Sequence, residues 1–408
     1  MLRAVSVALV ATVVPFLHAP AAAAAESCDL TLDRVLALAR ERAPAIVAAR
    51  SRVDEARARL DGASLLLREN PELEGDAGPR LSSQGDSTDV RARLSQALEL
   101  GGARGARIAG ASAGVAQAAA DADDALLRVR QAAAAAFLRT RAAVEQLALA
   151  ESTADMASEL LQAAERRHRA GDVPELDVDL AHAARSRARA DVAAARATRR
   201  ASAGRLAQLL ALGDAEPSPC GPLAAHAKLD LDELLRHAPE RADLRALAAS
   251  VDEAEADGRL AAARAWPAVR VGTEYKREQG DDVYLGGLSI SVPLFERGQS
   301  ARAEAEARAR RLRAEHEASV QAASSEVRTA WDVYRERRGA VAELARELPT
   351  LDDSDRLARR SYEAGELSLA DMLQLQRETL EIRRAGVEHA LDAALAAVEL
   401  QAAAGVLR

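Results

Sequence analysis

The chain has 408 residues, enough for two or three ordinary domains, and its formal net charge is −8. Charged residues make up 29% of it and aromatic residues only 2%, a composition typical of long helices rather than of a compact α/β enzyme. No segment is basic enough to follow a phosphate backbone, so a nucleic-acid partner is not indicated.

Residues 1–25 have the pattern of a secretory signal peptide. Arg3 is the positive start, residues 5–17 form a short apolar core, and Ala23-Ala24-Ala25 is a small-residue cleavage site before Glu26. A retained membrane anchor is the alternative. Beyond residue 25 no apolar run approaches the roughly 18 residues that a transmembrane helix requires.

Two cysteines remain after the signal peptide, Cys28 and Cys220. Export would place both in an oxidising compartment, where one disulfide can form. Two free, unrelated cysteines are the alternative. Neither has the spacing of a metal ligand set.

The mature chain repeats one pattern, over residues 26–217 and again over 218–408, with an offset of about 195 residues. Each repeat is expected to hold two short helices, a hairpin of strands, a long helix and a return helix. The first repeat predicts helices over 31–42, 45–69, 103–169 and 175–212. The second predicts helices over 230–237, 240–265, 300–363 and 368–403.

The long helix of the first repeat contains no proline and would be about 100 Å long. Its apolar and small residues recur in alternating steps of three and four, as in a coiled coil, so it must lie along other long helices. A solvated coiled-coil rod is the simplest alternative. In the second repeat Pro349 is expected to kink or interrupt the corresponding helix.

Each long helix is expected to end at a turn of alanine, glycine and an acidic residue. These turns are Ala170-Gly171-Asp172 and Ala364-Gly365-Glu366. Glycine after a helix permits the left-handed backbone that ends it, and an acid is favoured near the start of the next helix. Local capping alone would explain these residues.

Between the helices, four segments are expected to form strands, at about 71–78, 88–98, 268–276 and 283–294. Apolar and polar residues alternate along them, most clearly around Val269-Arg270-Val271. One apolar and one polar face is the pattern of a membrane barrel strand, although a soluble hairpin gives the same pattern. Four of the chain's few aromatic residues flank or occupy the second hairpin, as expected at a bilayer interface: Trp266, Tyr275, Tyr284 and Phe295.

The predicted strands of one chain are too few to close a membrane barrel. One chain supplies four, whereas outer-membrane barrels need at least about eight. An open sheet edge in lipid leaves backbone groups without partners, so a barrel can close only if two or more chains contribute strands.

With its signal peptide, twofold repeat, hairpins and glycine turns, the chain resembles the TolC-like outer-membrane efflux channels. The strings 70–74, 95–102, 167–172 and 362–368 carry the resemblance, and the first two look most like the heavy-metal branch of the family. The resemblance implies a mainly α fold with a small β part: long antiparallel coiled-coil helices in two tandem repeats, each inserting one hairpin. It also implies a homotrimer with a 12-stranded barrel in the outer membrane and an α-helical barrel in the periplasm.

The resemblance further implies that the glycine turns form the periplasmic tip of the channel, where a periplasmic adaptor protein and an inner-membrane RND-type pump dock. By position, the tip pattern corresponds to Arg167, Gly171, Asp172, Tyr362, Gly365, Glu366 and Ser368. Acidic residues after the turns are expected to surround the entrance and favour cations: Asp177, Asp179 and Asp371. Ordinary solvated acids at helix starts are the alternative.

The expected function is passive conduction from the adaptor and pump to the cell exterior, with heavy-metal cations as the cargo. Conduction of drugs or of polypeptides in type I secretion is the alternative. A periplasmic coiled-coil spacer, or the adaptor itself, is the alternative from another class. No phosphate loop, nucleophile and base, or metal-ligand spacing appears, so neither an enzyme nor a cofactor is expected.

Overall fold

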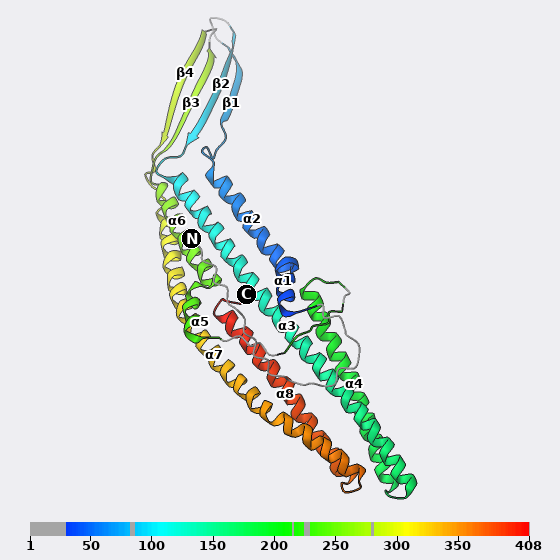
Figure 1. Cartoon of the computed structure of the whole chain (residues 1–408). Coiled ribbons are helices and arrows are strands. Elements are labelled where there is room, and N and C mark those ends of the chain that lie inside the picture. The colour runs from blue at the N-terminus through cyan, green and yellow to red at the C-terminus, as the bar shows by residue number, and fades with distance from the viewer. Residues whose placement is uncertain (1–29, 82–85, 214–215, 224–228, 279–280, 408) are drawn as a thin grey trace.

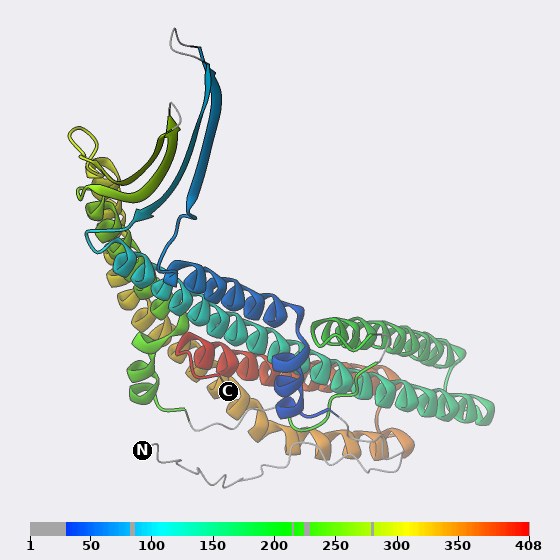
Figure 2. The same cartoon turned by 90° about the horizontal axis from the view of Figure 1, so that it is seen from above.

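The computed structural model describes residues 30–81, 86–213, 216–223, 229–278 and 281–407. The expected signal peptide, residues 1–25, lies outside the described residues. The molecule is elongated, with a sheet at one end, two helical hairpins at the other and shorter helices between them (Figure 1). Seen from above, the sheet is a curved ribbon (Figure 2).

Both repeats have the same order of elements. The first contains α1 (Leu32–Arg42), α2 (Pro44–Ser64), β1 (Glu72–Arg80), β2 (Ser87–Leu98), α3 (Ala103–Ala170) and α4 (Glu175–Leu209). The second contains α5 (Leu231–His237), η1 (Ala238–Glu240), α6 (Ala242–Ala263), β3 (Ala268–Glu278), β4 (Asp281–Ser291), α7 (Gln299–Glu363) and α8 (Leu369–Ala403). This is the mainly helical, twice-repeated fold that the sequence predicts.

The return helices α4 and α8 show how closely the repeats correspond. Each has 35 residues, and Leu206 on α4 and Leu400 on α8 are both completely buried. The second residue after each helix also has the same backbone conformation in both repeats. Ala211 has φ 52° where Gly405 has φ 74°, so an alanine takes the left-handed conformation that normally favours glycine.

Helix α2 ends at Ser64, so the prediction of a helix to residue 69 is wrong. Arginines on α3 bind the free carbonyls at this end: Arg104 Nη2 donates to Ser64 O at 2.7 Å and Arg107 Nε donates to Ala63 O at 3.0 Å. Hydrogen bonds from a neighbouring helix satisfy the carbonyls of the last turn of α2, so the helix ends before it reaches Pro71. A cap supplied across the fold cannot be seen in the local sequence.

Of the two outcomes expected at Pro349, a kink or an interruption, the interruption does not occur. Helix α7 continues from Gln299 to Glu363 with the proline inside it, and its ribbon follows a bowed path (Figure 1). Proline removes one N–H and crowds one carbonyl, but α7 packs against α8 on both sides of this position, through Tyr334 before it and Ala358 after it. Tertiary packing therefore outweighs the local penalty.

The four strands form one antiparallel sheet in the order β1-β2-β3-β4. Leu94 on β2 lies opposite Leu73 on β1 and Thr273 on β3, and Tyr275 on β3 lies opposite Tyr284 on β4. Strand β4 ends at Ser291, whereas the predicted strand continues to residue 294. It ends early because the nearby Pro293 has no N–H to donate to a ladder.

Near the sheet the helices lie side by side in the order α2, α3, α6, α7. Towards the other end α3 contacts both α4 and α8, and α7 contacts α8. The largest apolar core lies between these two regions and contains residues of α1, α3, α4 and α8, such as Val35, Phe137 and Leu206. Over the described part of the chain, no helix combines the length and apolar character needed to cross a bilayer.

Candidate functional site

The two helical hairpins end in glycine turns, as the sequence predicts. Gly171 has φ 85° and Gly365 has φ 78°, a conformation that an L side chain rarely adopts. The amide of Asp172 donates to Arg167 O at 2.9 Å, and the amide of Glu366 donates to Ser361 O at 2.8 Å. These are the bonds of a Schellman-type helix end, so both turns are explained by local capping.

Arg167 joins the two hairpins at this tip. Its guanidinium carbon lies 5.3 Å from the centre of the Tyr362 ring, and its Nη1 donates to Tyr362 O at 3.2 Å. A cation over an aromatic face is attractive, more so when water is excluded. Because Arg167 belongs to α3 and Tyr362 to α7, this contact holds the first hairpin to the second.

Tyr362 is buried in an apolar cluster to which all four tip helices contribute, with Leu161, Ala181, Ala358 and Met372 among its members. Its hydroxyl has no hydrogen-bond partner among the described residues. Burial raises the pKa of Tyr362, the positive charge of Arg167 opposes this shift, and the negative charge of Asp177 adds to it. Asp177 therefore lies close enough to this contact to act on it electrostatically.

The other predicted tip residues occupy separate positions. Ser368 begins α8, where its hydroxyl donates to Asp371 Oδ2 at 2.6 Å and accepts from the Asp371 amide at 3.2 Å. Asp371 is thus partly engaged as a cap. Asp172, Asp179 and Glu366 are exposed. A Cβ on Gly365 would lie 3.4 Å from Arg167 Nη2, so Gly365 belongs with the Arg167 contact.

The sequence did not indicate one buried charged residue near the tip, Asp355. Asp355 on α7 is 6% exposed and lies 3.5 Å from Arg359 Nη2 and 3.9 Å from Arg383 Nη2. Beside it, Gln376 Nε2 is buried with no partner among the described atoms. A signal was present: Asp355 occupies the position on α7 that the buried Leu161 occupies on α3. A charged residue on a packing face marks a polar contact between helices.

One face of the sheet carries a network of charges centred on Glu274. Among the described positions of the sheet, Glu274 is the only charged residue that is buried. Its carboxylate lies 2.5 Å from Arg93 Nη2, 3.4 Å from Arg91 Nε and 3.1 Å from Lys276 Nζ. Further ion pairs on this face link Arg270 with Glu72, and Arg80 with Asp89 and Glu278. The polar side of the predicted barrel strands is therefore a continuous network across β1, β2 and β3.

The opposite face is apolar and largely open. Leu73 is 76% exposed and Leu288 is 63% exposed, although both lie in regular register with the neighbouring inner strand. Val90, Leu94, Val271 and Ile290 share this face by register and are also exposed. An open apolar face of this extent is unusual for a soluble surface and suits contact with lipid.

The four aromatic residues fall at two levels of the sheet. Trp266 precedes β3 and Phe295 follows β4, both at the end nearest the helices. Tyr275 and Tyr284 face each other near the far end, with ring centres 5.3 Å apart. The glycine of the adjoining turn is needed for space, because a Cβ on Gly101 would lie 2.2 Å from Trp266 Cδ1. Whether these levels coincide with the bilayer interfaces stays a prediction.

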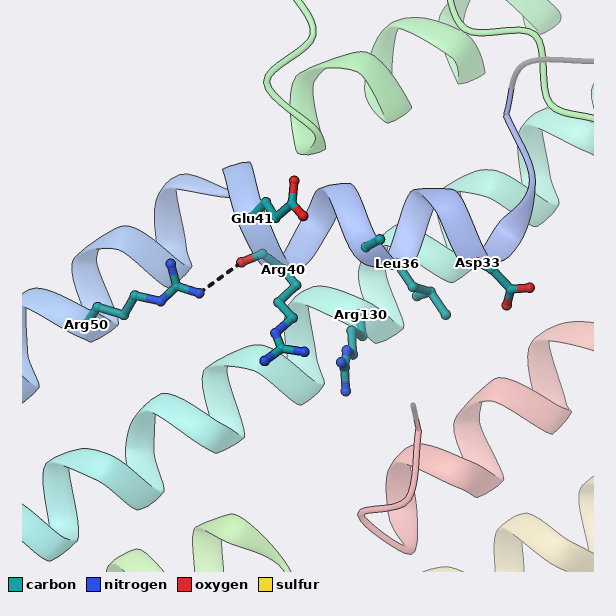
Figure 3. A pocket seen from close by; sticks show the side chains of 7 residues that line it. Asp33, Leu36, Arg40, Glu41, Arg50 and Arg130 are labelled. Atoms are coloured by element: carbon teal, nitrogen blue, oxygen red, sulfur yellow. Dashed lines mark hydrogen bonds between the residues drawn. The ribbon is translucent and has the colours of Figure 1, made fainter. Parts of the chain in front are cut away.

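A pocket of about 350 Å³ lies beside α1. Arg40 from α1, Arg50 from α2 and Arg130 from α3 line it, and Arg50 Nη2 donates to Arg40 O at 3.4 Å. Figure 3 shows the Arg40 and Arg130 side chains extending to the same side, while Glu41 points away from them. Burial, together with the charge of Arg40, lowers the pKa of the Arg130 guanidinium. The pocket holds neither a nucleophile nor a histidine that could act as a base.

The expected disulfide stays a prediction because Cys28 lies outside the described residues. The segment that carries Cys220 runs beside Leu30, two positions after Cys28 in the sequence. The Cys220 amide donates to Leu30 O at 3.0 Å, and Leu30 pairs with Pro219 in a short parallel bridge. Among the residues that the structure describes, His, Cys, Asp and Glu form no group that could hold a metal ion.

Comparison with known proteins gives one consistent answer. The family model for outer membrane efflux proteins matches residues 35–212 and 236–406. The cobalt-zinc-cadmium resistance protein CzcC of Cupriavidus metallidurans is 27% identical over 361 residues, which cover 87% of this chain and 85% of CzcC.

Solved structures agree in fold. CusC superposes with a TM-score of 0.77 at 18% identity, over 91% of each chain. The open state of the MtrE outer membrane channel of Neisseria gonorrhoeae has a TM-score of 0.76 at 22% identity, over 92% of this chain and 89% of MtrE. Since the family model covers most of both repeats, the chain belongs to the outer membrane efflux proteins, the TolC-like channels of the outer membrane.

Proposed function

We propose that three copies of the chain form a channel that conducts heavy-metal cations outward, as the outer-membrane part of a tripartite pump. One observation carries the assembly of several copies, and the family resemblance sets their number at three: the sheet of one chain has one open apolar face and two edge strands, β1 and β4. Backbone groups at such edges have no partner in lipid, and four strands are too few to close a barrel. Three copies supply twelve.

The dimensions of the sheet support its place in a bilayer. Strand β3 has 11 residues. At about 3.3 Å per residue and a tilt of about 40°, a strand of this length rises about 25 Å, the height of the apolar band of outer-membrane barrels. The charged network around Glu274 then faces the water-filled interior.

The tip supports a channel that is held closed and opens on contact with a partner. Arg167 and Tyr362 bind the two hairpins of one chain together. Among the described residues, no other polar contact between α3 and α7 is as well buried. An adaptor that competes for these groups would release one hairpin from the other. The channel itself performs no chemistry, and the pump supplies the energy.

The choice of metal cations rests on two supports. The named relative CzcC is a cobalt-zinc-cadmium resistance protein. In addition, acids follow both tip turns, including Asp177 and Asp179 on α4 and Asp371 on α8. In a threefold assembly these would repeat around the entrance and raise the local concentration of cations.

Deletion of the gene in its own host tests the cargo. We expect greater sensitivity to zinc, cobalt and cadmium, unchanged sensitivity to common antibiotics, and rescue by a plasmid copy. Sensitivity to antibiotics alone would replace metal efflux with drug efflux. Purification from the outer membrane tests the channel itself: we expect a heat-modifiable trimer, whereas a monomer released by osmotic shock would indicate a periplasmic spacer.

A further inference from the structure

The pocket beside α1 brings together arginines from three helices: Arg40 on α1, Arg50 on α2 and Arg130 on α3. We infer that this pocket binds a small water-borne anion that carries phosphate or carboxylate groups. A guanidinium presents paired N–H donors that match the oxygen atoms of such groups. The inference goes beyond the proposed channel, since it requires neither a particular cargo nor a given number of copies.

None of the ion pairs between described residues includes an arginine of this pocket. On the same helix as Arg130, by contrast, Arg128 pairs with Asp124. The sequence explains the difference, because charged pairs on a helix form at a spacing of three or four residues. The residues four positions before and after Arg130 are Leu126 and Ala134, so its own helix offers it no carboxylate at that spacing.

Arg130 is half-buried, whereas Arg40 and Arg50 are exposed. Its Nη1 donates to Leu407 O at 3.3 Å, but its Nε is buried and has no hydrogen-bond partner among the described atoms. Burial and the charge of Arg40 both lower the pKa of Arg130, so the protein holds this cation at a cost in free energy. A bound anion would reduce the cost, because it supplies both an acceptor and an opposite charge.

Two acidic residues also line the pocket, Asp33 and Glu41. Figure 3 shows Glu41 pointing away from Arg40 and Arg130. Asp33 lies in the first turn of α1, at the opposite end of the helix from Arg40, and forms no ion pair with the arginines within the described part of the chain. The positive charge of Arg40 and Arg130 is therefore not neutralised inside the pocket.

The second repeat packs the corresponding helices without these charges. The helices align through Glu-Arg-Ala at 41 and 240, Val-Asp-Glu-Ala at 53 and 251, and the buried residues at 133 and 327. The counterparts of the three arginines are then Pro239, Ala248 and Ser324. Both repeats place the two shorter helices against the long one, so this packing does not require the arginines. Their convergence in the first repeat calls for another reason.

The size of the pocket excludes a single monatomic ion as its natural occupant. Its volume is about 350 Å³, whereas a water molecule occupies about 30 Å³ in the liquid. Pockets for small molecules begin at about 300 Å³. An anion of several non-hydrogen atoms, with more than one oxygen to share among the guanidinium groups, fits this space.

The place of the pocket in the fold indicates where the anion comes from. Helix α2 has 21 residues and is therefore about 30 Å long, and it separates α1 from the sheet (Figure 1). With the sheet in the bilayer, as the proposed function has it, a lipid headgroup lies too far away to reach the pocket. The anion therefore enters from the water phase.

Isothermal titration of the purified protein, in detergent and a chloride buffer, tests the site. The probes are citrate, a tricarboxylate, and inorganic phosphate, with the monocarboxylate acetate as the control. We expect one citrate to bind per chain, phosphate to bind more weakly and acetate not to bind. Arg40→Gln and Arg130→Gln should each weaken the binding of citrate about tenfold or more. The matched control is Arg139→Gln, on an exposed position of the same helix α3, which should bind citrate as the parent chain does.

Arg40 is exposed, so Arg40→Gln should fold normally and keeps the test decisive if Arg130→Gln does not fold. Equal affinity of Arg40→Gln and the parent chain for citrate, or no binding of citrate and phosphate by the parent chain, would overturn the site. Displacement of bound citrate by phosphatidylglycerol vesicles would overturn the water-borne ligand and indicate a lipid headgroup. Native mass and channel conductance are measured separately, so each of these results leaves the proposed channel intact.

Discussion

At the helical tip, within the part of the chain that the structure describes, Arg167 and Tyr362 are the one pair that joins α3 to α7 through both a ring and a backbone contact. The guanidinium lies 5.3 Å from the ring centre and donates to the tyrosine carbonyl at 3.2 Å. Tyr362 is 3% exposed and Arg167 is half-buried, so the pair is partly protected from water. Its strength sets how readily one hairpin separates from the other.

Arg167→Ala is expected to loosen the closed tip. A partly desolvated cation–π contact together with a charge-assisted hydrogen bond is worth about 1–2 kcal/mol, so the open fraction should rise roughly tenfold. Single-channel recordings in planar bilayers should show higher conductance at rest. The neighbouring Arg166→Ala, which removes an exposed charge from the same turn, serves as the control, and equal conductance of the two variants would contradict the role of Arg167.

Ala211→Gly is expected to stabilise the protein. Ala211 has φ 52° and corresponds to Gly405, which has φ 74°. A left-handed conformation costs a non-glycine residue about 1–2 kcal/mol, and the greater freedom of glycine in the unfolded chain offsets part of that gain. The reverse change, Gly405→Ala, should destabilise, because its Cβ would also lie 3.1 Å from Arg241 Cγ. Thermal unfolding of the two variants in detergent should shift in opposite directions.

Much of the architecture follows from local patterns. Heptad spacing predicts α3, α4, α7 and α8, and period-two alternation predicts the sheet, because both patterns repeat over many residues and average out individual exceptions. The turns at Gly171 and Gly365 are also local, since the left-handed backbone explains each glycine by itself. The errors lie where distant residues act: Arg104 and Arg107 end α2, and packing carries α7 through Pro349.

The functional contacts were harder to predict for the same reason. Arg167 and Tyr362 both belong to the predicted tip, but nothing in the sequence pairs them, because 195 positions of the chain separate them, from α4 to the end of α7. Glu274 lies on the predicted polar face, yet its three cationic neighbours come from two strands brought together by register. Sequence patterns identify the face on which a residue lies, and the fold alone identifies its partner.

Glu274→Ala is expected to weaken the sheet. The carboxylate lies between Arg91, Arg93 and Lys276, and its removal leaves three like charges in one neighbourhood. Hydrogen bonds to charged groups are stronger than those between neutral groups, so their loss weakens the contact between β2 and β3. The trimer should therefore dissociate at a lower temperature on semi-native gels. Glu74→Ala is the control, because Glu74 lies 3.9 Å from Arg93 and is mostly exposed; a similar shift in both variants would argue against a special role for Glu274.

Glu145→Gln is expected to stabilise the protein in a pH-dependent manner. Burial raises the pKa of Glu145, and the nearby Arg141 at 2.9 Å opposes the shift without cancelling it. A carboxyl whose pKa is raised on folding costs stability when ionised. This cost is absent below the usual pKa of about 4.3, grows between that pKa and the raised pKa of the folded protein, and is constant above it.

The measurement is the difference in midpoint of thermal unfolding between the variant and the parent chain. It should be near zero at pH 4 and favour the variant at pH 8. Glu151→Gln is a suitable control on the same helix, because Glu151 pairs with Arg196 on the exposed side. A stabilisation by Glu145→Gln that is equal at both pH values would show that the glutamine acts through packing and not through charge.

Asp177→Asn together with Asp371→Asn is expected to reduce the cation preference of the channel. Asp177 is half-buried and acts on Tyr362, and Asp371 is exposed at the start of α8. In a trimer the double variant removes six negative charges from the entrance, so the reversal potential in a salt gradient should move towards zero. Asparagine can still accept the hydrogen bond from Ser368, so the cap of α8 is retained. Asp232→Asn together with Glu233→Gln, on the distant helix α5, also removes six charges and controls for net charge. An unchanged reversal potential in the double variant would show that these acids serve only as helix-start residues, and that any preference for cations arises elsewhere along the tunnel.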